Sequence, residues 1–249
     1  MSARTAAVPI GACLAALVLA ACGPGQSATD GKGRAASAGD SYADKTPEEI
    51  RQLAYDTTRT ADFKKVRARL EGDGVTRSLD FSFARVDCAG TFSGEGLGRT
   101  EIHATPEVVH AKLDAEAWRA SLTGSKAQED AAVERAAGRW IRLTADQAEA
   151  KGIGQECRFS DPTMLLEEQD PQITRGASAT VDGQPAVTLT HRAAGGGTVT
   201  DYVAAQGRPY LLKRTQTGRL RSEITYYDFE TVTQLRPPAD SETVTAEGL

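Results

Sequence analysis

The stretch "KVRARLEGDGVTRSLDFSFARV", residues 65–86, decides the fold. Apolar and charged side chains alternate over 65–71, and apolar residues stand at every second position again over 77–86. A period of two is typical of a strand with one buried face. The glycine-rich segment 72–74 lies between the two runs and can turn the chain, so we expect an antiparallel hairpin.

The same signals recur along the rest of the chain. We expect further strands at 97–104, 107–113, 139–143, 173–181, 184–192, 198–206, 208–216 and 221–229, and a last one near 231–235. Asp182-Gly183 is a hairpin turn signal between two of them. Short strands joined by close turns favour an antiparallel sheet over alternating strand–helix units.

Helices are expected before and between these strands. Thr46 followed by Pro47 reads as a helix start, with Ile50, Leu53, Ala54 and Thr57 on one face. Further helices are expected at 115–122 after a capping Asp114, at 126–138, at 144–152 and at 161–169. The predicted fold class is therefore α+β, mainly antiparallel β.

The N-terminus predicts export. One basic residue precedes an apolar run of small residues, which is typical of a secretory signal peptide over residues 1–21. The run ends in Leu19-Ala20-Ala21-Cys22, which resembles the bacterial lipobox, where the cysteine is diacylated and the signal is cut before it. Cys22 is therefore the expected lipid attachment site, and the alternative is an ordinary signal followed by a chance cysteine.

Composition divides the mature chain in two. Residues 22–45 are mostly Gly, Ala, Ser and Asp and predict a flexible tether, whereas 46–249 suits one folded domain. We expect the protein at the extracytoplasmic face of the cell membrane, held there by its diacylglyceryl-cysteine. A formal net charge of −5 gives no basic footprint for nucleic acid.

Two cysteines remain in the predicted domain, Cys88 and Cys157. In an oxidising compartment two cysteines most simply form a disulfide. Two separate thiols or a redox pair are the alternatives, but no C-x-x-C spacing favours redox chemistry.

Residues for catalysis or metal binding are scarce. His103 and His110 lie on neighbouring predicted strands with Glu101 nearby, but a zinc site needs three or four converging ligands, and His191 is the only other histidine. No G-x-S-x-G, H-E-x-x-H or P-loop motif is present. We therefore predict no enzyme, no metal and no cofactor.

Basic residues cluster in the last strands of the sequence: Arg208, Lys213, Arg214, Arg219 and Arg221. On alternating strands such residues form a solvated sheet face, which is the expected role here. The functional alternative is attraction to anionic lipid head groups or to an acidic partner.

Three stretches resemble a known family. They are "DCAGTFSGEG" (87–96), "DAEAWRA" (114–120) with "GRWIRL" (138–143), and "DYVAAQGRPYLLKRTQ" (201–216), and together with the lipobox they resemble the LolA-like and LppX/LprG-like lipoproteins of actinobacteria. The resemblance covers about residues 46–238. It implies a strongly curved, half-barrel-like sheet with helices packed on its concave side, where some members hold acyl chains of a lipid.

Two functions follow as hypotheses. The first is a membrane-anchored lipoprotein that binds or carries a lipid, glycolipid or other amphiphile in the cell envelope. The second is a non-enzymatic module with the same fold that contacts an envelope protein. A continuous apolar tunnel on the helix-bearing side of the sheet would favour the first, and a core filled with side chains would favour the second. No ligand-binding residues are predicted from the sequence.

Overall fold

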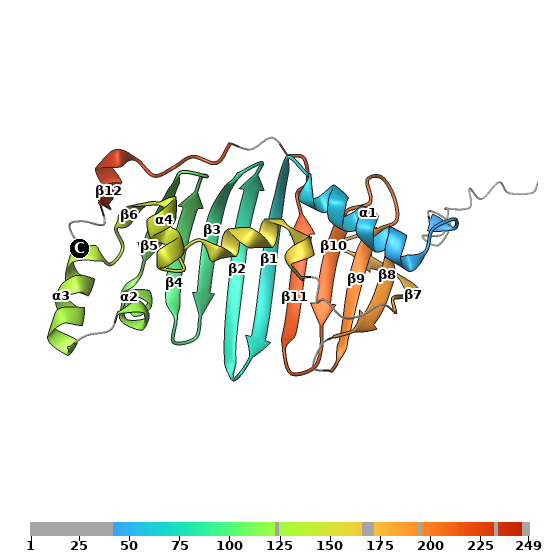
Figure 1. The fold of residues 1–249 in the computed structure, drawn as a ribbon, viewed down its shortest axis with the longest axis horizontal. Coiled ribbons are helices and arrows are strands. Elements are labelled where there is room, and N and C mark those ends of the chain that lie inside the picture. Colours follow the sequence, from blue (N-terminus) through green and yellow to red (C-terminus); the bar gives the residue numbers. More distant parts are fainter. Residues whose placement is uncertain (1–41, 123–124, 166–171, 194–195, 232–233, 246–249) are drawn as a thin grey trace, which may run out of the picture. The chain divides into compact units, whose positions relative to one another are not determined.

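Twelve strands form one open, curved sheet in the computed structural model, which describes residues 42–122, 125–165, 172–193, 196–231 and 234–245 (Figure 1). The strands are β1 (Phe63–Gly72), β2 (Val75–Ala84), β3 (Asp87–Gly94), β4 (Gly98–Ala104), β5 (Val108–Leu113), β6 (Trp140–Thr144), β7 (Thr174–Val181), β8 (Gln184–Arg192), β9 (Thr198–Ala204), β10 (Leu211–Gln216), β11 (Arg221–Tyr227) and β12 (Thr243–Thr245). The α-helices are α1 (Pro47–Arg59), α2 (Ala115–Ser121), α3 (Lys126–Ala136) and α4 (Ala145–Ala150), and the 3-10 helices are η2 (Gln155–Ser160), η3 (Pro162–Leu165) and η4 (Asp240–Glu242).

The sheet consists of two antiparallel meanders joined side by side. Its order is β12-β6-β5-β4-β3-β2-β1-β11-β10-β9-β8-β7. Strands β1 to β6 follow one another in space, as do β7 to β11, and the pairing of β1 with β11 joins the two sets. Only β12 runs parallel to its neighbour, β6. The outer strands β12 and β7 do not meet, so the sheet stays open, and the predicted fold class is confirmed.

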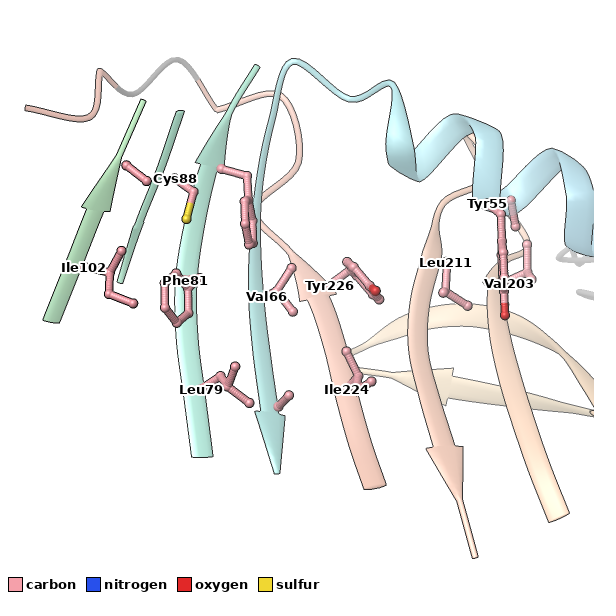
Figure 2. Packing of buried hydrophobic residues seen from close by; sticks show 14 of the residues in the cluster. Tyr55, Val66, Leu79, Phe81, Cys88, Ile102, Val203, Leu211, Ile224 and Tyr226 are labelled. Carbon is pink, nitrogen blue, oxygen red and sulfur yellow. The ribbon is translucent and has the colours of Figure 1, made fainter. Parts of the chain in front are cut away.

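One face of the sheet carries the helices and most of the core; we call it the helix face. Figure 2 shows side chains of this core, among them Leu79 and Phe81 of β2, Val66 of β1 and Tyr226 of β11. Because side chains alternate along a strand, the residues between them point to the opposite, open face. Arg67 there lies opposite Asp80 and Thr225 in the register and is exposed.

Helix α1 lies over β9 and β10 on the helix face (Figure 1). Thr46 caps it as predicted: its hydroxyl accepts from Glu49 N at 3.2 Å, and Glu49 Oε2 accepts from Thr46 N at 2.8 Å. The predicted buried stripe was partly wrong. Ile50 and Ala54 are buried, but Leu53 is 38% exposed, and Tyr55 and Thr58 are buried instead.

A disulfide between Cys88 and Cys157 fixes η2 over the middle of the helix face, the pairing that the sequence predicts. The Cα atoms are 5.8 Å apart, within the usual range for a disulfide. The bond joins β3 to a short helix that has few apolar residues of its own. It therefore holds a segment that packing alone would hold weakly.

Several elements differ from the sequence prediction. Strand β3 was not among the strands expected from alternation, and the short helix η4 was not expected either. No strand includes Thr231, Gln234 or Leu235, and residues 232 and 233 lie outside the described part of the chain. The last described strand, β12, begins eight residues after Leu235. The helix predicted at 161–169 is the 3-10 helix η3, followed by residues that the structure does not describe. Helix η2 was not predicted, because its sequence has no apolar periodicity. Among the described residues, no helix is long and apolar enough to cross a membrane.

Candidate ligand-binding pocket

A cavity of about 400 Å³ opens on the helix face and is lined by residues of α2, α3, β5 and β6 and of the segment after α4. Eight of its ten lining residues are apolar, and two are polar. The lining consists of Leu113, Trp118, Ser121, Leu122, Ala132, Ala136, Ile141, Leu143, Lys151 and Ile153. We call this cavity the helical pocket.

Strands β5 and β6 supply the floor of the helical pocket. Their register pairs Val109 with Leu143 and Ala111 with Ile141. Side chains of such pairs lie on the same face of a sheet, and Leu113 follows two residues after Ala111 on that face. The three floor residues Leu113, Ile141 and Leu143 are 7%, 4% and 2% exposed. The floor is therefore apolar and buried.

Helix α2 forms one wall because its start is tied to β4. The Asp114 carboxylate caps the helix, accepting from Ala117 N at 2.7 Å, and also accepts from Arg99 N at 2.9 Å. Gly98 lies directly below with φ +65°, and a Cβ atom there would come within 2.2 Å of Ala117 N. Glycine thus permits the close approach that places Trp118 against the cavity.

Helix α3 forms the opposite wall and explains why there is empty space. It begins after Ser125, whose backbone N–H donates to Gln128 Oε1 at 3.0 Å. Ala132 and Ala136 are four residues apart and so lie on one side of the helix, toward the cavity. Their single methyl groups do not reach far into the space that larger side chains would fill.

The rim of the helical pocket is polar and positively charged. Helix α4 starts at its cap Thr144, as predicted, and is followed directly by Lys151. Ser121 and Lys151 are both exposed, and Lys151 is the only charged residue among those described that line the cavity. The polarity of the helical pocket therefore increases from an apolar floor to a positively charged rim.

The helix face beneath α1 is filled instead by a buried polar cluster. Tyr55 Oη donates to Asp201 Oδ2 at 2.8 Å, and Arg214 Nη1 lies 3.3 Å from Asp201 Oδ1 and also donates to Tyr55 Oη. Asp201 and Arg214 are 0% and 2% exposed at the side chain. Burial, together with the Asp201 charge, raises the pKa of Tyr55 well above its usual value, so Tyr55 stays a donor.

A second buried polar group lies between β1 and the 3-10 segment. Lys64 is 3% exposed, and its Nζ donates to Arg59 O at 3.3 Å. Burial lowers the pKa of Lys64 to about 8, against the opposing attraction of Asp161 and Glu230. An apolar ligand would gain no binding free energy beside such polar groups. This part of the helix face therefore suits the packing of the protein's own side chains rather than lipid binding.

The three histidines of the chain do not line the helical pocket. Cys22 lies outside the described residues. His103 and His110 pair across β4 and β5 with ring centroids 6.2 Å apart, but both are buried, on the open face away from the helical pocket. His191 is half-buried on β8. Within the described ranges, no three His, Cys, Asp or Glu side chains gather as metal ligands.

The basic cluster is only partly the solvated face that was expected. Four of its residues form ion pairs at the surface: Arg208 with Glu230, Lys213 with Glu223, Arg219 with Asp73, and Arg221 with Glu71. The expectation was wrong for Arg214, because the chain shifts by one residue at a bulge between β9 and β10. That shift turns Arg214 to the helix face, opposite Asp201.

Sequence reasoning missed the helical pocket altogether. Its lining residues come from four elements and from residues that follow α2 and α4, and they lie together through the pairing of β5 with β6 and the packing of α2 on α3. One signal was available. Trp118 stands in a short helix beside an alanine-rich one, and a large side chain next to small ones leaves unfilled volume.

The fold of this chain is similar to several solved structures at low sequence identity. No protein-family profile matches the sequence. No curated protein is found to be similar to it. The fold is similar to the lipoprotein LppX of Mycobacterium tuberculosis, with 14% identity over 75% of this chain and 97% of that one and a TM-score of 0.48.

Two further solved structures are similar in the same way. LprF from Mycobacterium bovis shares 14% identity over 78% of this chain and 97% of its own, with a TM-score of 0.48. The MucA/MucB complex of Pseudomonas aeruginosa contains a chain with 14% identity over 78% of this chain and 59% of that one, with a TM-score of 0.33. At these values the likeness concerns the fold, and no ligand or partner is argued from it.

Proposed function

We propose that this protein binds the apolar chain of an amphiphile in the helical pocket. The observation that carries the proposal is the polarity of the cavity: a buried floor of Leu113, Ile141 and Leu143 below an exposed rim of Ser121 and Lys151. Ligand pockets are mostly apolar with a few polar groups that orient the ligand. An amphiphile matches both ends of such a cavity.

The volume of the helical pocket limits the size of the ligand that it can hold. About 400 Å³ lies near the lower end of the roughly 300–1,000 Å³ of small-molecule sites. Asp201 and Arg214 on β9 and β10, and Lys64 on β1, occupy a part of the helix face away from β5 and β6. The cavity therefore suits one chain rather than the several chains of a large glycolipid.

We further propose that the protein is a lipid-anchored, non-enzymatic lipoprotein of the LolA-like or LppX/LprG-like kind, on the outer side of an actinobacterial cell membrane. The lipobox ending at Cys22, the tether 22–45 and the resemblance of three sequence stretches support this. A disulfide between Cys88 and Cys157 suits an oxidising compartment. The tether would hold the helical pocket near its membrane, where amphiphiles are available.

One observation favours the alternative, a protein-interaction module. Strand β7 (Thr174–Val181) lies at the edge of the sheet, has mostly exposed side chains, and pairs only with β8 among the described strands. Such an edge can accept an added strand from a partner. Crosslinking at the cell surface that recovers no reproducible partner would count against this alternative.

The pocket proposal is tested with Ala132→Trp, which places a large side chain in the cavity from a half-buried position. Ala131→Trp is the matched control, because Ala131 is exposed on the same helix and does not line the cavity. A fluorescent fatty acid, cis-parinaric acid, is titrated into both variants. We expect saturable binding that Ala132→Trp weakens at least about tenfold, or about 1.4 kcal/mol.

Trp118 gives an independent readout of the same titration. The chain has two tryptophans, and Trp140 lies on the open face beside Lys112. In a Trp140→Phe background that keeps Ala131 and Ala132, Trp118 is the remaining tryptophan, and energy transfer from it to the probe reports binding near the helical pocket. Equal affinity of the two alanine variants, or no saturable transfer, would overturn the proposal.

A further inference from the structure

The rim of the helical pocket has one accessible charged donor. Lys151 is exposed, and no described carboxylate lies within ion-pair distance of its Nζ. On α3, the Lys126 ammonium pairs with Asp130 at 2.6 Å. The positive charge at the mouth is therefore not neutralised by the protein's own acids.

The other polar groups of the helical pocket are not free to donate to a head group. Ser121 Oγ already donates to Trp118 O at 2.9 Å. The indole Nε1 of Trp118 is buried and has no acceptor among the described residues, and it is closed off from solvent. An incoming head group therefore meets the Lys151 ammonium first.

An ammonium at the mouth of the cavity selects by charge, since it attracts an anionic head group and repels a cationic one. Because Lys151 is exposed, the attraction has the strength of a surface ion pair. With its tail on Leu113, Ile141 and Leu143, an amphiphile would bring its head group to the rim, near Lys151.

We propose that the helical pocket selects single-chain amphiphiles with an anionic head group, whose charge pairs with Lys151. The inference rests on the proposed function, because it concerns the same cavity. The shared chemistry is one alkyl chain that ends in a carboxylate or a phosphate monoester. A free fatty acid and a monoalkyl phosphate are both sources of that chemistry.

The test compares ligands with one tail and different head groups: dodecanoate, dodecyl phosphate, dodecanol and dodecylammonium. Each displaces cis-parinaric acid from the full-length chain, at a pH where the acids and the amine are ionised. We expect the two anions to bind about threefold to fivefold more tightly than dodecanol, since an ion pair at an exposed ammonium contributes at most about 1 kcal/mol. Dodecylammonium should bind more weakly than dodecanol. The ratio of dodecanoate to dodecyl phosphate distinguishes the two sources.

Two substitutions at Lys151 and one control sharpen the result. Lys151→Gln should reduce the preference for anions to about the level of dodecanol, and Lys151→Glu should reverse it in favour of dodecylammonium. Lys45→Gln removes the same charge ahead of α1, next to Asp44, and should change nothing. Circular dichroism checks that each variant is folded.

The outcomes separate this inference from the proposed function. Equal binding of dodecanol and dodecanoate, unchanged in Lys151→Gln, would overturn the charge selection and leave the pocket proposal standing. A preference for anions that persists in Lys151→Gln would also overturn it, since another group would then be responsible. Binding of none of the four ligands would overturn both proposals.

Discussion

The Asp201 carboxylate and the Arg214 guanidinium face each other across β9 and β10 at 3.3 Å, both out of contact with water beneath α1. The pair also holds Tyr55, so it ties the helix to the sheet. The Asp201, Tyr55 and Tyr226 groups together outweigh burial and raise the pKa of Arg214, which stays charged.

Arg214→Met should therefore destabilise the protein strongly. The variant leaves the Asp201 carboxylate buried without its partner, and breaking such a pair costs about 3–5 kcal/mol. Lys213→Met is the matched control, since Lys213 pairs with Glu223 at the surface, where a pair contributes at most about 1 kcal/mol. Urea unfolding measures both, and similar midpoints for the two variants would contradict this view of the buried pair.

Removing the disulfide should loosen η2 and lower stability. Its loop spans 69 residues, and closing such a loop stabilises a fold by about 4 kcal/mol in the chain-entropy account. We expect the Cys88→Ala/Cys157→Ala variant to show a lower urea midpoint, matched by the reduced wild type. If a reductant shifted the midpoint of the double variant as well, the effect would not come from this bond.

His110 should make stability depend on pH. Burial, His103 and Arg142 lower the pKa of His110, while Asp240 opposes them. The unfolded chain, with a pKa near 6.5, then binds more protons than the folded one. The contribution of neutral His110 to the free energy of unfolding is fully present above about pH 6.5 and decreases as the pH falls below that value.

His110→Gln should flatten this dependence between about pH 6.5 and 5. Urea midpoints measured across that range give the slope. A wild type whose stability rose as the pH fell, or a variant with the slope unchanged, would show that His110 does not carry the dependence.

Gly98→Ala should disturb the helical pocket through its α2 wall. A methyl group at position 98 would lie within 2.2 Å of Ala117 N, and φ +65° is unfavourable for alanine. Gly96→Ala is the control, with φ +70° and nothing within 4 Å of the added methyl. We expect Gly98→Ala to lose at least about 1 kcal/mol more than the control and to bind cis-parinaric acid more weakly.

Cys22→Ser should release the protein from the membrane. The wild type is expected in the membrane fraction with a mass that includes acyl chains, and the variant in the soluble fraction without them. Fractionation followed by intact-mass measurement decides this. Identical partitioning and equal masses, apart from the substituted atom, would refute the assignment of Cys22 as the lipid attachment site.

Local chemistry made much of the fold predictable. The alternation over 65–71 and 77–86 gave β1 and β2, and Thr46, Asp114 and Thr144 marked the starts of three helices. The sequence pattern did not predict elements or side-chain positions that are determined by tertiary packing. Strand β12 pairs with only three residues of β6 and has no signal of its own, and Arg214 is buried because of a bulge.

The helical pocket could not be predicted for a related reason. A cavity is the volume that side chains from several elements leave unfilled, so it depends on how Trp118 stands relative to Ala132 and Ala136. Neither helix propensity nor hydrophobic periodicity predicts how far Trp118 lies from these two alanines. Cys88 and Cys157, in contrast, could be paired from the sequence, because only two cysteines remained in the predicted domain.

The most direct test of the pocket is photo-crosslinking with a diazirine-bearing dodecanoate, followed by peptide mapping of the labelled full-length protein. The account predicts that labels fall within residues 113–153, on the floor and walls of the helical pocket, and that excess dodecanoate removes them. Labels concentrated on the strands beneath α1 or on the open face, or labelling no stronger than that of the denatured chain, would contradict it.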